Sequence, residues 1–92
     1  MCRNIRVLHH FAPPTTTEEI RAAATQYVRK VGGITRPTAI SQPAFALAVD
    51  EIAAATERLL AALPSRGEPR TREGELQKAR LRFAKRAARS VR

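Results

Sequence analysis

One cysteine and two histidines near the N-terminus carry the side chains best suited to metal or thiol chemistry. Cys2 is the only thiol in the 92 residues, and His9 and His10 follow in the same short segment. Removal of Met1 would give Cys2 both an α-amino nitrogen and a thiolate, which together can chelate a metal. Sulfur and nitrogen ligands suit zinc and other transition metals. A transition-metal or reactive-thiol site built from Cys2 with His9 is therefore one hypothesis.

A structural interpretation of these residues stays open beside the chemical one. Their spacing lacks the C-x-x-C and H-x-x-x-H patterns of well-defined metal sites, and a lone cysteine often packs as a small apolar side chain. The carboxylates and serines form no recognisable acid–base or nucleophile–base pair. Asp50 and Glu51, for example, are adjacent and would point about 100° apart on a helix. We therefore assign no catalytic residue, and an enzyme is the less favoured class.

Basic residues dominate the charge and concentrate near the C-terminus. Lys and Arg number 17 against 8 Asp and Glu, which gives a formal net charge of +9. Residues 64–92 hold ten basic and three acidic side chains (+7), whereas residues 1–63 hold seven and five (+2). On a helical wheel, five basic residues of the segment 73–92 share one sector, opposite a narrow apolar strip. These five are Lys78, Arg82, Lys85, Arg89 and Arg92.

A cationic ridge of this kind attracts phosphate groups, because each neutralised phosphate releases condensed counterions. The sequence thus predicts nonspecific contact with nucleic acid, and five contacts to duplex DNA would give a log K against log salt slope of about −4.5. Two alternatives stay open: a solvated face that keeps the protein soluble, and an acidic protein partner. An anionic membrane is disfavoured, because the apolar strip is thin and lacks Trp.

Two amphipathic helices are expected to form the compact part. Thr16 and Glu19 have the spacing of a capping box, and an apolar stripe follows until a pair of glycines, which predicts a helix over 17–31. A second helical repeat of apolar residues begins beside Pro43 and stops before Pro64, which predicts a helix over 43–63.

The expected fold is all-α: a small helical bundle of two antiparallel core helices plus a basic C-terminal helix. We divide the chain into a helical core domain (1–63), a mobile linker (64–72) and the basic C-terminal helix (73–92). A short chain with so few large apolar residues buries little surface as a monomer, which favours a homodimer through the Ala-rich flank of helix 43–63. The chain has no apolar run long enough to span a membrane, no recognisable signal peptide and one cysteine, so we expect a cytoplasmic protein.

Several strings along the chain are specific: MCRNIR at 1–6, EIRAAA at 19–24, QYVRKV at 26–31 and EIAAAT at 51–56. They resemble a small bacterial family of uncharacterised proteins, domain of unknown function 2277, over most of the chain. The resemblance implies no activity, but it implies that the segment before the first helix is more than a loose tail. The chain departs from the family pattern at His10, where Asn is usual. Cys2 and His9 fit the pattern, so only a metal model that needs both histidines is weakened.

Overall fold

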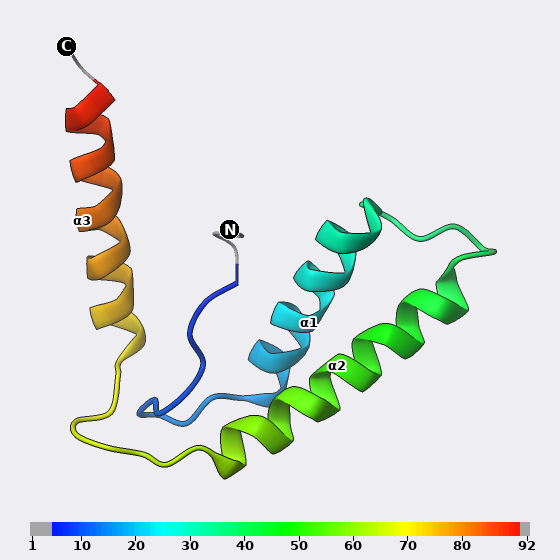
Figure 1. The fold of residues 1–92 in the computed structure, drawn as a ribbon, viewed down its shortest axis with the longest axis horizontal. Coiled ribbons are helices and arrows are strands. Elements are labelled where there is room, and N and C mark those ends of the chain that lie inside the picture. The colour runs from blue at the N-terminus through cyan, green and yellow to red at the C-terminus, as the bar shows by residue number, and fades with distance from the viewer. Residues whose placement is uncertain (1–4, 91–92) are drawn as a thin grey trace.

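The structure consists of a helical hairpin and a third helix that stands apart from it (Figure 1). The computed structural model describes residues 5–90, with the side chains of residues 5–88. Its helices are α1 (Thr17–Gly32), α2 (Gln42–Ala62) and α3 (Arg72–Ser90). No strand occurs among the described residues, so the predicted all-α class is confirmed.

Helix α1 begins and ends as its sequence predicts. The Thr16 hydroxyl accepts the Glu19 N–H at 3.1 Å, and Glu19 Oε1 accepts the Thr16 N–H at 2.9 Å, which completes the capping box. At the other end Gly33 has a φ of 65° and donates its N–H to the Arg29 carbonyl. This left-handed conformation favours glycine, because a Cβ would crowd the backbone there.

Helix α2 returns alongside α1, and the two share a small core (Figure 1). The buried side chains are Ile20 and Ala24 of α1 with Val49 and Ala53 of α2. Partly buried apolar residues surround them, among them Leu8 of the segment that precedes α1. Because two of the four buried residues are alanines, this core covers little apolar area, and other contacts must help to hold the chain together.

Helix α3 does not pack along either of the other helices. Figure 1 shows it leaving the loop after α2 and rising beside the stretch that precedes α1. Three of its large apolar side chains are well exposed: Leu76 (44%), Leu81 (63%) and Phe83 (71%). The helix begins at Arg72, one residue before the expected domain boundary, and the division into three parts stays a prediction.

None of the three helices, within the described part of the chain, combines the length and apolarity needed to cross a membrane.

Candidate functional site

The stretch before α1 and the start of α3 are tied together, although some sixty residues separate them. We call the described residues before the cap of α1, 5–14, the N-terminal segment. The Arg70 N–H donates to the His10 carbonyl at 2.7 Å, and the Ala12 N–H donates to the Arg70 carbonyl at 2.9 Å. The Arg70 guanidinium also donates to the His9 carbonyl, and His10 Nε2 lies 3.0 Å from the Gly67 carbonyl oxygen. The end of the expected mobile linker is therefore hydrogen-bonded in place.

Arg72, the first residue of α3, donates hydrogen bonds from all three nitrogens of its guanidinium. Its Nε and Nη2 donate to the two carboxylate oxygens of Glu19 at 2.9 and 2.7 Å, in the two-bond geometry that arginine and carboxylates favour. Nη1 and Nη2 also donate to the carbonyls of Pro13 and Pro14 at 2.7 and 3.1 Å. The cation lies 5.4 Å from the centre of the Phe11 ring, within range of a cation–π interaction. We call this set of contacts the Arg72 clamp.

The Arg72 clamp changes the acidity of Glu19. Hydrogen bonds from Arg72, followed by the backbone N–H of Thr16, lower the pKa of Glu19 from 4.5 to about 2. The same hydrogen bonds, which the Glu19 carboxylate accepts, raise the pKa of Arg72. One carboxylate thus caps α1 and holds α3. The sequence indicates the first role through the capping box, but it gives no local signal for a partner 53 residues away.

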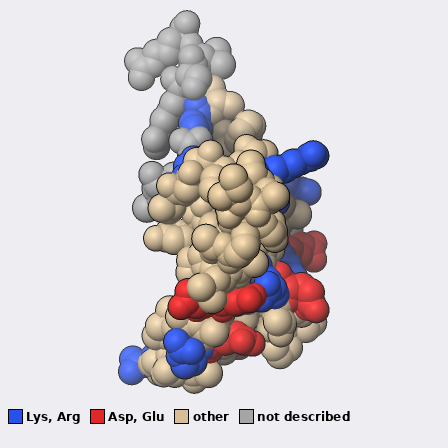
Figure 2. Space-filling model, turned by 90° about the vertical axis from the view of Figure 1, so that its right-hand side faces the viewer, with Lys and Arg blue, Asp and Glu red and all other residues tan. Residues whose placement is uncertain are grey.

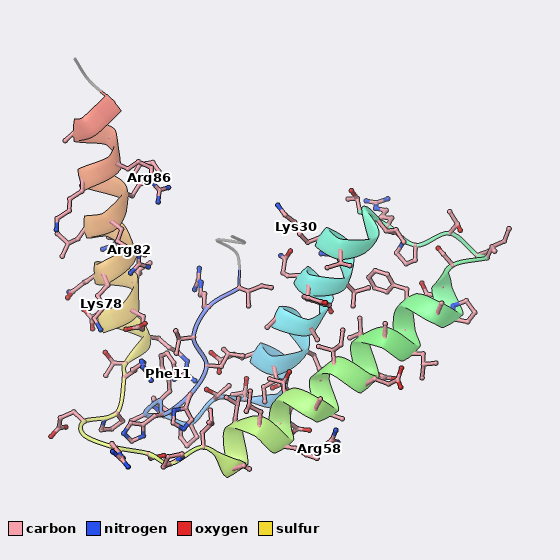
Figure 3. The ribbon with its side chains drawn as sticks, in the orientation of Figure 1. Phe11, Lys30, Arg58, Lys78, Arg82 and Arg86 are labelled. Carbon is pink, nitrogen blue, oxygen red and sulfur yellow. The ribbon has the colours of Figure 1, made fainter. Side chains whose placement is uncertain are left out.

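A groove lies between the N-terminal segment and α3, with a volume of about 330 Å³. Apolar side chains from both elements line it, together with three arginines and two glutamates. Phe11 lies at the foot of α3, and Arg82 extends from α3 toward the side on which the N-terminal segment runs (Figure 3). The complete lining is Ile5, Arg6, Val7, Leu8, Phe11, Glu19, Arg72, Glu75, Leu76, Ala79 and Arg82.

The basic residues expected to form one ridge on α3 fall into different environments. Lys78 forms an ion pair with Glu75 one turn earlier, with 3.1 Å between Nζ and Oε2. Arg82 and Lys85 are exposed, and neither makes an ion pair with a described residue. The backbone of Arg89 belongs to α3, whereas its side chain and the whole of Arg92 lie outside the described residues.

The expected metal site is described only in part, because Cys2 lies outside the described residues. His9 is half-buried, and its Nε2 is enclosed without a hydrogen-bond partner. The His10 ring lies 6.0 Å away, centre to centre. Within residues 5–90, no group of three or more His, Cys, Asp or Glu side chains is arranged to hold a metal.

The backbone of His10 has a φ of 61°, in the left-handed region. Asn tolerates that conformation better than other non-glycine residues. The Asn that the resemblance implies for this position would suit that conformation.

Comparison with known proteins gives one finding. A family model described as "Uncharacterized conserved protein (DUF2277)" matches residues 1–78. No curated protein and no solved structure matches the chain. The matched range contains the whole Arg72 clamp and most of the groove lining, and it stops within α3, four residues before Arg82.

Proposed function

The chain belongs to the DUF2277 family of uncharacterised conserved proteins, and, since that description names no activity, we propose from the surface of α3 that the protein contacts nucleic acid nonspecifically. The supporting observation is that α3 stands clear of the hairpin and carries Arg82 and Lys85 without a carboxylate partner among the described residues. We place this activity in the cytoplasm.

Contact with phosphates fits the chemistry of this helix better than reading of bases does. Guanidinium and ammonium groups bind phosphate oxygens whatever the sequence. Lys78 contributes less to phosphate binding than Arg82 and Lys85, because it must first break its ion pair with Glu75. The loop between α1 and α2, residues 33–41, is too long for these two helices to form a helix-turn-helix. We therefore propose salt-sensitive, sequence-independent binding.

Filter binding to duplex DNA and RNA across a range of salt concentrations tests this function. A triple variant, R82Q/K85Q/R89Q, removes three positive charges from α3. A control, R36Q/R58Q/R66Q, removes three charges from exposed positions elsewhere, so both variants have the same net charge. If the native slope of log K against log salt is about −4.5, the α3 variant should give about −1.8, because each lost contact removes about 0.9.

The control should keep nearly the native slope. Equal losses in the two variants would contradict a role for α3 and indicate general charge attraction. Binding that ignores salt would also overturn the proposal.

A second function is favoured by one observation, the enclosed and unpartnered Nε2 of His9. We propose as the alternative that Cys2 and His9 together hold a transition metal. Metal analysis of untagged protein should then find about one metal per chain, lost in Cys2→Ser and in His9→Gln. His10→Asn should keep the metal, because the site does not need that ring. Equally low metal in native protein and in Cys2→Ser would end this alternative.

A further inference from the structure

The groove between the N-terminal segment and α3 has the composition of a site for a small molecule. Its volume of about 330 Å³ lies at the lower end of the range for ligand pockets. Apolar side chains predominate on the wall formed by the N-terminal segment, and Leu76 and Ala79 add apolar surface from α3. Several of these side chains are well exposed: Ile5 is 37% exposed, Val7 50% and Leu76 44%. A ligand that covers them would remove apolar surface from water.

The charged side chains of the groove are not balanced. Of its two carboxylates, Glu19 is held by Arg72, and Glu75 is paired with Lys78 at 3.1 Å. Arg6 and Arg82 also line the groove, the first from the N-terminal segment and the second from α3. Neither makes an ion pair or hydrogen bond with a described residue, so two guanidinium groups are left uncompensated at an apolar surface.

We propose that this groove binds a small amphipathic anion, with a carboxylate held between Arg6 and Arg82 and a short apolar tail lying along Val7, Leu76 and Ala79. A guanidinium donates two parallel hydrogen bonds to a carboxylate, which gives both affinity and orientation. The apolar walls contribute by burial and do not suit a nucleic-acid backbone. The two arginines come from opposite walls, so the ligand joins α3 to the N-terminal segment beyond the reach of the Arg72 clamp.

Calorimetric titration with octanoate tests the site, with octanol and octylamine as matched probes. Octanoate should bind, octanol should bind at least tenfold more weakly, and octylamine should not bind. Arg6→Gln and Arg82→Gln should each weaken octanoate binding by about tenfold, because each removes charge-assisted hydrogen bonds. Ala79→Phe, which adds a ring to an exposed helical position facing the groove, should block binding.

Lys85→Gln is the control, since it removes a charge from α3 without touching the groove. It should leave octanoate binding unchanged while weakening nucleic-acid binding, whereas Arg6→Gln should do the reverse. Circular dichroism of every variant checks that the helices persist. The proposal is overturned if octanol binds as tightly as octanoate, if Arg6→Gln has no effect, or if octanoate does not bind at millimolar concentration.

Discussion

Replacement of Arg72 by glutamine is expected to raise the pKa of the Glu19 carboxyl from about 2 toward its ordinary 4.5. The substitution removes the pair of bonds from Nε and Nη2 and the positive charge behind them. The Thr16 N–H still donates to the carboxylate, so the new pKa should stop somewhat short of 4.5. Arg72→Lys keeps the charge but not the paired geometry and should give an intermediate value.

The size of the effect is easiest to see at pH 3.2. A carboxyl with a pKa of about 2 is roughly 94% ionised there, whereas one with a pKa of 4.5 is about 5% ionised. Because folding lowers this pKa, the stabilisation is fully present above about pH 4.5 and is lost as the pH falls through about 2. Native α3 should therefore stay docked at pH 3.2. In Arg72→Gln the dependence of docking on Glu19 ionisation should largely disappear.

An NMR titration of the Glu19 side-chain carboxyl carbon measures this pKa directly, and amide exchange in the first turn of α3 reports docking. Arg21→Gln is the matched control: it removes one positive charge nearby on α1, where Arg21 pairs with Asp50 at 2.8 Å, and it should leave Glu19 near 2. A native Glu19 that titrates near 4.5 while the helices remain folded would refute the reasoning. So would an Arg72→Gln variant whose Glu19 still titrates near 2.

Three further predictions concern stability and assembly. Gly33→Ala should destabilise the protein by about 1 kcal/mol in urea unfolding, because its φ is 65°, whereas Gly33→Asn should cost less. Ile20→Ala, at a site only 6% exposed, should lower the free energy of unfolding by roughly 3 kcal/mol in the same assay. A comparable loss for Val31→Ala, at a site 68% exposed, would contradict a core centred on Ile20. Sedimentation should detect a dimer formed through α2. A variant with both Leu47→Asp and Leu59→Asp should be monomeric, because it places charges on exposed apolar positions of that helix. A native protein that is monomeric at every concentration would rule the dimer out.

The loop end of the hairpin presents a face without charged side chains, and exposed apolar side chains continue along α2 away from that end. Figure 2 looks toward the side on which the loop between α1 and α2 lies, and the middle of that face shows no Lys, Arg, Asp or Glu. Leu47 and Leu59 of α2 are 59% and 55% exposed, and Ile40 in the loop is 93% exposed. A second copy that covers such side chains would add the apolar burial that the four-residue core lacks.

The hairpin could be predicted from sequence because its signals are local. The capping box at Thr16 and Glu19, the apolar period of each helix and the glycine at position 33 all act within a few residues of the boundary that they set. The structure places α1 at Thr17–Gly32 and α2 at Gln42–Ala62, within one residue of the expected bounds at each end.

The position of α3 could not be predicted, because it depends on contacts across more than fifty residues. Arg72 lies in a polar stretch rich in proline and arginine, and such a composition is typical of a linker. Nothing in its neighbourhood reveals that Glu19, two carbonyls and a ring surround its guanidinium. The same holds for the groove, whose two uncompensated arginines are brought together only when both walls are in place.

The backbone hydrogen bonds of Arg70 with His10 and Ala12 close a loop of about sixty residues, and this stretch of the chain contains both helices of the hairpin. A closure this long can form only after most of the polypeptide has left the ribosome, so the hairpin should assemble first and the loop should close last. The attachment of each end of the molecule consequently depends on the other end. Removal of the N-terminal segment would leave α3 held by the ion pair between Arg72 and Glu19. A truncation before Arg70 would remove the backbone partners of His10 and Ala12.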